Sequence, residues 1–142
     1  MVQNQNDKCY ASAMRLLVRR EHSTLELRQK LAAKGFDIEL IDFSICKLIE
    51  HNQQSDKRFA EDFIRMRFNQ GKGPVKISLE LKQKGIQSFS FSGFDFFSLA
   101  NKVRQKKFGT IIPNNYNDEA KQKRFLQSRG FNFDQIDSAF TK

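Results

Sequence analysis

Apolar residues recur at the spacing of an α-helix along most of the chain. Near its start they occupy positions i, i+3, i+4, i+7 and i+8, which together form one face of a helix. These residues are Tyr10, Ala13, Met14, Leu17 and Val18. The pattern predicts a first helix over residues 7–21 with this face directed inward. Ser23 followed three positions later by Glu26 is a capping box, and it predicts a second helix that ends at Gly35.

The next two helices are predicted by the same combination of caps and periodicity. Asp37 is placed to cap a third helix, which runs to about His51. Its inward face is predicted to comprise Ile38, Ile41, Ile45 and Leu48. A fourth helix follows, with Ser55 or Asp56 as its cap and Gly71 at its end. These segments therefore read as short helices joined by tight turns.

A short sequence repeat marks the ends of three helices. It has the form basic–Gly–apolar and occurs as Lys34-Gly35-Phe36, Lys84-Gly85-Ile86 and Arg129-Gly130-Phe131. A helix that starts at Pro74 precedes the second copy, and a longer helix over 95–107 lies ahead of the third. After the first and third copies, apolar residues recur at identical offsets, which in the third copy are Phe133, Ile136 and Phe140.

This repeat predicts an all-α protein of three tandem three-helix repeats, in an elongated, curved arrangement. The expected boundaries are residues 1–52, 53–94 and 95–142. The third helix of the middle repeat is expected to be short or irregular, because Ser88 to Ser92 alternates serine with phenylalanine and Gly93 follows. Since this alternating segment has no partner strand elsewhere in the sequence, a sheet is not expected.

The composition is that of a folded domain. The chain has 142 residues, of which 39% are apolar and 12% aromatic, with only 7 Gly and 2 Pro, and this excludes a disordered or collagen-like polypeptide. Two Cys are too few for a disulfide scaffold. The sequence contains no apolar run of the ~20 residues that a membrane-spanning helix needs, and its start lacks the apolar segment of a secretory signal. These features predict a soluble protein of the cytoplasm with no membrane partner.

Positive charge is concentrated in one part of the chain. Twenty-five Lys and Arg against 16 Asp and Glu give a net charge of +9. Residues 65–129 hold 14 of the basic side chains and only four acidic ones. A polyanion, or an acidic protein surface, is the partner that such a balance favours. The alternative is a solvated basic surface that only keeps the protein soluble.

The sequence contains no recognisable catalytic or metal-binding arrangement. Cys9 and Cys46 form no closely spaced pair, so we expect buried, reduced thiols and no zinc site. His22 and His51 lie near helix ends, where a protonated imidazole would stabilise the terminal carbonyls, and neither has a nucleophile at suitable spacing. Gly71-Lys72-Gly73-Pro74 lacks the Ser or Thr of a nucleotide-binding loop. We therefore expect a protein that is not an enzyme and needs no cofactor.

A set of segments in fixed order resembles the RecX family, the regulatory proteins of the RecA recombinase. The resemblance covers about residues 10–140, and the ordered set is specific although each motif alone is weak. The segments are Arg19-Arg20-Glu21-His22-Ser23, Glu26-Leu27 through Lys34-Gly35-Phe36, Asp56-Lys57-Arg58-Phe59-Ala60-Glu61, Gly71-Lys72-Gly73-Pro74, Leu81 through Lys84-Gly85-Ile86, Lys106-Lys107-Phe108-Gly109 and Arg129-Gly130-Phe131.

The resemblance implies a protein of three three-helix repeats that binds RecA filaments. It would inhibit RecA ATPase, strand exchange and co-protease activity, and so modulate recombination, DNA repair and the SOS response. Single- or double-stranded DNA within the filament is a further candidate contact, and no small-molecule substrate is implied. Our predicted RecA and DNA contacts are the basic side chains Arg65, Arg67, Lys72, Lys76, Arg104, Lys106, Lys107, Lys123, Arg124 and Arg129.

Two other functions fit the same pattern. A DNA-binding transcription factor is one, because short capped helices separated by Gly turns imitate a helix-turn-helix, although no single recognition helix stands out. A helical-repeat adaptor for an acidic protein, with no nucleic acid involved, is the other. Binding to single-stranded DNA with and without RecA and ATP discriminates among the three.

Overall fold

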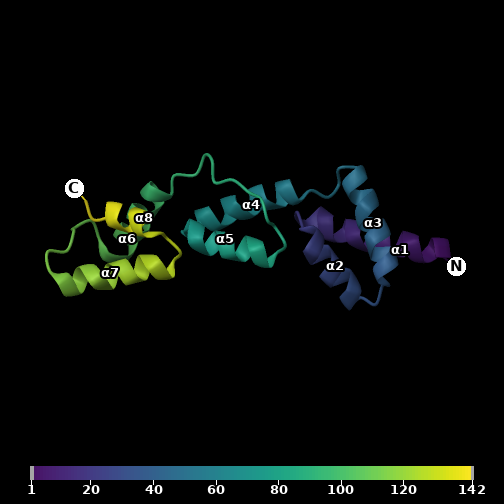
Figure 1. The fold of residues 1–142 in the computed structure, drawn as a ribbon, viewed down its shortest axis with the longest axis horizontal. Helices are drawn as coiled ribbons and strands as arrows, with labels where there is room; N and C mark the ends of the chain where they lie inside the picture. The colour runs from purple at the N-terminus through teal and green to yellow at the C-terminus, as the bar shows by residue number, and fades with distance from the viewer. Residues whose placement is uncertain (1, 142) are drawn as a thin grey trace. The chain divides into compact units, whose positions relative to one another are not determined.

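The fold is helical throughout the part of the chain that the computed structural model describes, which is residues 2–141, with side chains described from residue 5. Within these residues there are eight helices and no strand, so the all-α prediction is confirmed (Figure 1). The helices are α1 (Val2–Arg19), α2 (Thr24–Ala33), α3 (Ile38–Glu50), α4 (Asp56–Asn69), α5 (Pro74–Gln83), α6 (Phe96–Phe108), α7 (Tyr116–Ser128) and α8 (Phe133–Ser138). None of those described has the length and apolar character needed to cross a membrane.

The chain forms two compact units. The N-terminal unit comprises the chain up to Asp62 together with Leu81–Phe89, and the C-terminal unit comprises Phe63–Glu80 together with the chain from Ser90 onward. The division passes through α4 and α5, so these helices contribute residues to both units.

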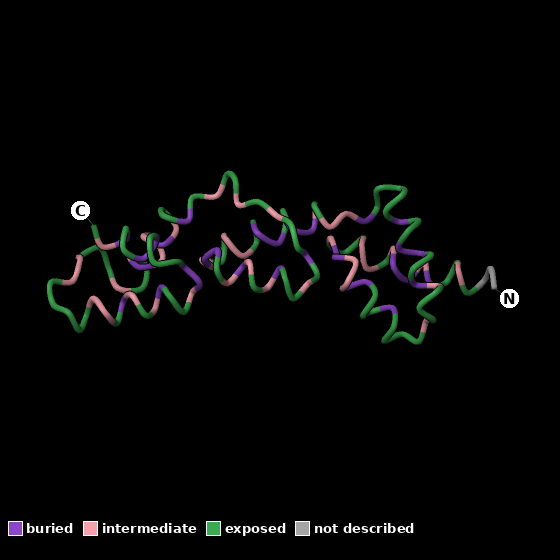
Figure 2. The backbone as a smooth tube through the Cα atoms, in the orientation of Figure 1, coloured by how far each residue is buried: buried purple, intermediate pink, exposed green. Residues whose placement is uncertain are grey.

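The core of the N-terminal unit lies among α1, α2 and α3. Its buried side chains are Cys9, Ala13, Leu27, Leu31, Ile41, Ile45 and Leu48, and Tyr10, Met14 and Leu17 pack partly buried against them. Buried stretches of the backbone are purple in Figure 2. The inward faces predicted for the first and third helices are confirmed at most positions. Two are wrong, because Val18 is 79% exposed and Ile38 is 64% exposed. Both residues lie in a terminal turn of their helix, where the neighbouring helices no longer cover them.

The two cysteines differ in burial. Cys9 is buried, as predicted, whereas Cys46 is exposed. Cys46 follows the buried Ile45 in α3, and consecutive helical residues point about 100° apart. The prediction of a buried Cys46 is therefore wrong because it ignored the face of the helix on which the residue lies.

Helix capping agrees with the sequence at two of three predicted sites. Ser23 Oγ accepts a hydrogen bond from Glu26 N (3.1 Å), and Glu26 Oε1 accepts one from Ser23 N (3.2 Å), which completes the capping box. Ser55 Oγ accepts from Arg58 N (3.1 Å), so Ser55 caps α4 and Asp56 does not. Asp37 occupies the N-cap position of α3, but its side chain makes no capping hydrogen bond.

The core of the C-terminal unit is formed by α6, α7 and α8 with aromatic residues from α4 and the segment before α6. Its buried side chains include Phe96, Ala100, Leu126, Phe131 and Ile136. Phe68 lies 5.2 Å from both Phe94 and Phe96, measured between ring centroids. Phe133, at the position equivalent to Ile38, is 74% exposed, so that position is exposed in both copies.

The segment before α6 contains neither a helix nor a strand between residues 86 and 95, and the short or irregular helix expected there is absent. Ser88, Ser90 and Ser92 are exposed, and Phe89 and Phe91, which alternate with them, are half-buried. Alternation of this kind is typical of extended backbone, since successive side chains point to opposite sides. The alternation of serine and phenylalanine therefore indicates an extended segment, which pairs with no strand in the described chain.

Candidate functional site: a cationic groove

Two turns of the C-terminal unit are joined through their backbones. Gly73 N donates a hydrogen bond to Arg129 O (2.8 Å), and Val75 N donates one to Gly130 O (2.9 Å). The contact is so close that a Cβ atom added at Gly73 would overlap the backbone of Gly130. We call this contact the turn joint. It brings the start of α5 against the α7–α8 turn, so basic residues from both turns are drawn together.

Four cations gather around the turn joint. Lys72 and Lys76 come from the α5 side, Arg129 from the end of α7, and Arg67 from the end of α4. Partial burial lowers the pKa of the Lys72 ammonium, and the charges of Arg129, Lys76 and Arg67 lower it further against the opposing effect of Glu80. Four like charges therefore act on one another around the turn joint, and Glu80 is the acidic group that opposes them.

Arg67 is the member of this cluster whose charge is matched within the unit. Its guanidinium pairs with Glu80 (2.7 Å) and donates a hydrogen bond to Gln70 Oε1 (2.8 Å). It also lies 5.2 Å from the ring centroid of Phe63. Lys72, Lys76 and Arg129 therefore carry most of the charge that the turn joint can offer to a partner.

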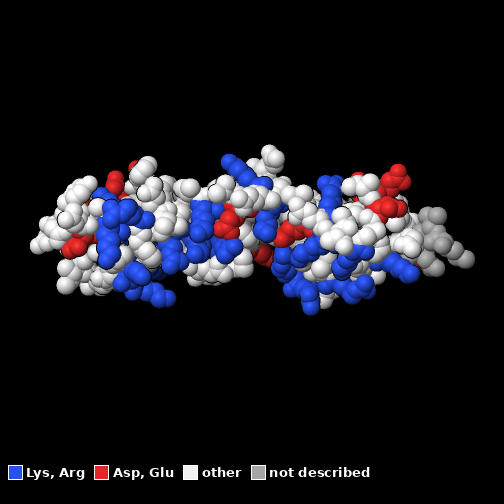
Figure 3. Space-filling view, turned by 90° about the horizontal axis from the view of Figure 1, so that it is seen from below, with Lys and Arg blue, Asp and Glu red and all other residues white. Residues whose placement is uncertain are grey.

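A groove of about 480 Å³ extends from the turn joint along α6. Among the described residues that line it, none is acidic. Its cationic side chains are Lys102, Lys106, Lys107 and Arg129, and its apolar side chains are Leu99, Val103 and Phe125. Figure 3 shows Lys and Arg side chains over α5 and α7, and also over the helices of the N-terminal unit. The groove can attract an anion electrostatically while offering apolar surface beneath it.

Phe125 links the cations of the groove to its apolar surface. The Arg129 guanidinium lies 5.0 Å and the Lys107 ammonium 5.4 Å from its ring centroid. Phe108 packs edge-on against the same ring, with centroids 5.4 Å apart and an interplanar angle of 89°. These cation–π contacts orient both basic side chains along the groove.

Comparison with known proteins assigns the chain to a family. Family models described as the first, second and third three-helix domains of RecX match residues 9–48, 55–88 and 95–140. Regulatory protein RecX of Legionella pneumophila (strain Corby) is 41% identical over 139 residues, which cover 94% of this chain and 93% of the relative. The chain belongs to the RecX family.

Other RecX proteins agree in sequence and in fold. Regulatory protein RecX of Halorhodospira halophila (strain DSM 244 / SL1) is 38% identical over 134 residues, covering 90% of this chain and 83% of the relative. The crystal structure of RecX from Lactobacillus salivarius superposes with a TM-score of 0.78 at 25% identity, covering 96% of this chain and 95% of that one. The resemblance recognised from the ordered motifs is confirmed.

The residues predicted as contacts of this RecX family member lie in the C-terminal unit, but in different settings. Lys106, Lys107 and Arg129 line the groove, and Lys72, Lys76 and Arg67 surround the turn joint. Arg65 and Arg124 are exposed on α4 and α7, away from the groove lining. Lys123 pairs with Asp137 (3.3 Å) and lies 5.5 Å from the Phe140 ring centroid.

Lys102 lines the groove but was missed from the sequence as a contact residue. A signal for it exists, because Lys102 and Lys106 are four residues apart in α6, as are Leu99 and Val103. Residues at this spacing lie one above the other on a helix. The two pairs therefore form adjacent cationic and apolar rows along α6.

The prediction that Arg104 contacts a partner is wrong. Its side chain is 1% exposed, so a partner on the surface cannot reach it. Its Nε donates a hydrogen bond to Ala139 O (3.1 Å), and its Nη1 lies within hydrogen-bond distance of Gly109 O (3.4 Å) and Gln122 Oε1 (3.4 Å). The guanidinium also lies 5.4 Å from the Phe140 ring centroid. Arg104 thus ties α6 to the chain around α7 and α8.

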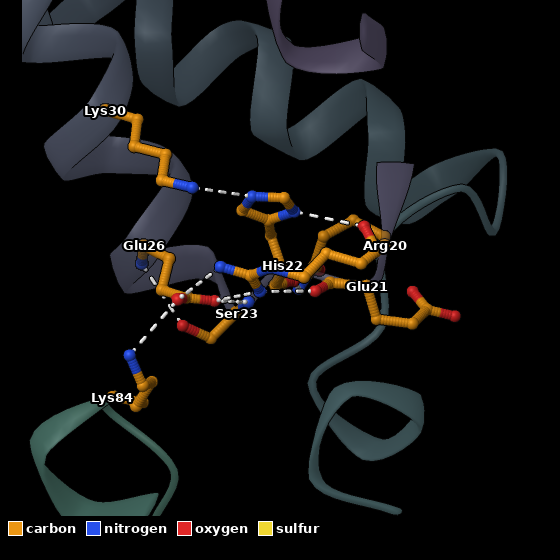
Figure 4. A network of polar contacts seen from close by, with 8 residues as sticks. Arg20, Glu21, His22, Ser23, Glu26, Lys30 and Lys84 are labelled. Atoms are coloured by element: carbon orange, nitrogen blue, oxygen red, sulfur yellow. Dashed lines mark hydrogen bonds and ion pairs between the residues drawn. The ribbon is translucent and has the colours of Figure 1, made fainter. Parts of the chain in front are cut away.

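A second polar cluster lies in the N-terminal unit, around the buried carboxylate of Glu26 (Figure 4). Arg20 donates two hydrogen bonds to it, at 3.1 and 3.0 Å, and Lys84 Nζ lies 3.3 Å from Glu26 Oε2. Burial alone would raise the pKa of Glu26, but hydrogen bonds from Arg20 and the Ser23 backbone, with the charges of Arg20 and Lys84, lower it to about 2. The cluster thereby connects α2 to the chain that follows α1 and α5.

His22 beside this cluster is a neutral structural residue. Its Nδ1 lies 3.0 Å from Arg20 O, which can only accept, and its Nε2 lies 3.0 Å from Lys30 Nζ, which can only donate. Burial lowers the pKa of His22, and the charges of Arg20 and Lys30 add to this effect. The prediction of a protonated imidazole at a helix end is therefore wrong for His22.

Glu26→Gln is expected to flatten the acid dependence of stability. Because the pKa of Glu26 in the folded state is about 2, below its ordinary value of 4.5, its stabilisation is present above pH 4.5 and is lost as the pH falls toward 2. Wild type should lose about 2 kcal/mol more unfolding free energy than Glu26→Gln between pH 5 and pH 2. Urea denaturation at each pH measures this, and Glu39→Gln, an exposed carboxylate of α3, is the control. Parallel curves for wild type and Glu26→Gln would contradict the assignment.

Proposed function

We propose that this RecX family member binds RecA nucleoprotein filaments and inhibits RecA ATPase, strand exchange and co-protease activity, and that it modulates recombination, DNA repair and the SOS response in this way. Membership of the family of regulatory proteins carries this proposal. Regulation then proceeds by binding, with no chemical step, in the cytoplasm where RecA and DNA are found. The proposed repeats are residues 1–52, 53–94 and 95–142.

The charge distribution supports the proposal. A RecA filament presents acidic side chains and the phosphates of its DNA, and the turn joint and groove of the C-terminal unit offer Lys72, Lys76, Lys106, Lys107 and Arg129 to them. Lys106 and Lys107 are exposed and the other three are partly exposed. Cations at the surface steer association and favour partners of opposite potential. Occupation of the filament by the bound protein would block or destabilise filament growth.

Reversal of charge in the groove is expected to weaken RecA inhibition. The double variant Lys106→Glu/Lys107→Glu should need about tenfold more protein than wild type to halve RecA ATPase activity on single-stranded DNA, because like charges would face the acidic partner. The measurement is ATP hydrolysis at substoichiometric to equimolar protein. The double variant Lys47→Glu/Lys57→Glu makes the same change of charge at exposed residues of the N-terminal unit and should stay close to wild type.

Two results would speak against this function. Unchanged ATPase activity at equimolar wild-type protein, with tight and selective binding of one duplex sequence, would replace it with the transcription-factor alternative. Binding to an acidic protein with no effect on RecA would favour the adaptor. Salt dependence separates the contributions to binding, because each phosphate neutralised on single-stranded DNA contributes a log–log slope of about −0.7.

A further inference from the structure

The groove combines two kinds of surface that a purely electrostatic site does not need. Leu99 and Val103, one helical turn apart in α6, form a half-buried apolar floor. Lys102 and Lys106, also one turn apart, lie exposed beside them, with Arg129 at the turn joint. The volume of about 480 Å³ lies within the ~300–1,000 Å³ typical of ligand pockets. An occupant that matches this groove must therefore be anionic and partly apolar.

A nucleic-acid strand matches only half of this surface. Its phosphates would pair with the lysines, but the sugar–phosphate backbone has no aliphatic side chain to cover Leu99 and Val103. In proteins that bind single-stranded nucleic acid, the bases stack on aromatic side chains. Phe125, the aromatic ring of the groove lining, already contacts Lys107, Arg129 and Phe108. Base stacking would have to displace these contacts.

An acidic peptide segment matches both halves. Its carboxylates form charge-assisted hydrogen bonds with lysine and arginine, and one aliphatic side chain among them can cover the floor. The absence of any acidic residue from the described lining leaves no charge there to repel the carboxylates. The rows on α6 place cationic and apolar groups side by side, as a segment with one aliphatic side chain among its carboxylates requires.

We propose that the groove lined by Leu99, Val103, Lys102 and Lys106 docks an acidic peptide segment of a partner protein, with one aliphatic side chain seated on the Leu99–Val103 floor. The inference rests on the proposed function in taking the RecA filament as the source of that segment, whereas the chemistry of the segment follows from the groove itself.

The proposal predicts that binding depends on the aliphatic side chain as well as on charge. The probes are a fluorescein-labelled peptide Glu-Asp-Glu-Leu-Glu-Asp-Glu, the same peptide with Ser in place of Leu, and a labelled oligo(dT) of about 20 nucleotides, each titrated with the full chain by fluorescence anisotropy. Wild type should bind the Leu peptide about tenfold more tightly than the Ser peptide, since burial of an aliphatic side chain supplies this difference.

Variants of the groove separate the two contributions. Leu99→Trp fills the floor without changing charge and should abolish the preference for the Leu peptide while leaving the Ser peptide nearly unaffected. Leu99→Ser removes part of the floor without added bulk and should have the same effect. Thermal melting checks that both Leu99 variants are folded. Lys102→Glu/Lys106→Glu should weaken the binding of both peptides about tenfold or more. Lys121→Glu, an exposed charge on α7 outside the groove lining, is the control and should bind like wild type.

The outcomes are distinct from those that test RecA regulation. Equal affinity of wild type for the two peptides, or a preference that survives Leu99→Trp and Leu99→Ser, overturns the docking proposal. If wild type binds oligo(dT), the groove variants lose that binding, and wild type shows no preference between the peptides, then the groove is a nucleic-acid site. RecA ATPase that is unaffected by wild type, together with a clear Leu preference, rejects the proposed function and keeps the docking site. Inhibition of RecA without any preference for the Leu peptide rejects the docking site and keeps the proposed function.

Discussion

Replacement of Arg104 with alanine is expected to destabilise the C-terminal unit by about 3–5 kcal/mol, which would place it among the most damaging single substitutions in the chain. The guanidinium is completely enclosed, and its hydrogen-bond acceptors are uncharged oxygens of Ala139, Gly109, Ile111 and Gln122. Truncation would leave these oxygens without their donor and open a cavity beside Phe140. Arg104→Lys should recover little, because an ammonium cannot reproduce the planar set of donors.

Denaturant unfolding monitored by circular dichroism measures this effect. Lys106→Ala, an exposed side chain on the same helix, should change the unfolding free energy by no more than about 0.5 kcal/mol. A stable Arg104→Ala variant with weakened RecA inhibition would restore the original interpretation of Arg104 as a contact residue. Arg104 should therefore be left unchanged in any charge-reversal test of the groove.

Gly130→Ala is expected to cost about 3 kcal/mol, against about 1 kcal/mol for Gly35→Ala. Both glycines follow a helix in the left-handed region, at φ +96° and +93°. At Gly35 a Cβ atom would meet nothing within 4 Å beyond its chain neighbours in the described structure, so only backbone strain is added. At Gly130 the Cβ would lie 2.8 Å from Lys76 N and closer still to Lys76 Cβ. The variant must therefore open the turn joint.

Matched unfolding experiments on the two alanine variants measure the difference between them. Because the backbone conformations are alike, the excess cost at Gly130 reports the close approach of the two turns alone. Equal destabilisation of the two variants would show that the turn joint contributes nothing to stability. Opening the joint should also separate Arg129 from Lys72 and Lys76, so Gly130→Ala should reduce RecA inhibition even at temperatures where it remains folded.

Most helix boundaries could be predicted closely because their signals are local. The start of the first helix is an exception, because the periodicity predicts residues 7–21 and α1 spans Val2–Arg19. Ser23 with Glu26, Ser55, Pro74 and the glycine at Gly35 act on backbone groups within a few residues. Predictions failed where exposure depends on a neighbouring element. Ile38, which has the same periodicity as the buried Ile41 and Ile45, is exposed because it lies at the first position of α3.

The candidate site was predicted by region but not by residue. The basic segment 65–129 does supply the cations of the groove and the turn joint. Its charge count could not separate Arg104, which is buried, from Lys106 and Lys107, which are exposed. Helical spacing held part of the answer, since Arg104 continues the buried row of Phe96 and Ala100 at four-residue intervals.

The amino-acid sequence by itself determined the helices, the repeated basic–Gly–apolar turns and the family, because each depends on residues that are close together or on the order of motifs along the chain. The tertiary structure alone decided which basic side chains are available to contact a partner. Arg104 is satisfied by Ala139 O, Arg67 is neutralised by Glu80, and Lys72 meets Arg129 across the turn joint. These partners are separated in sequence by up to tens of residues and are brought together only by packing, which local spacing does not encode. The chemistry of the groove is therefore a property of the folded C-terminal unit.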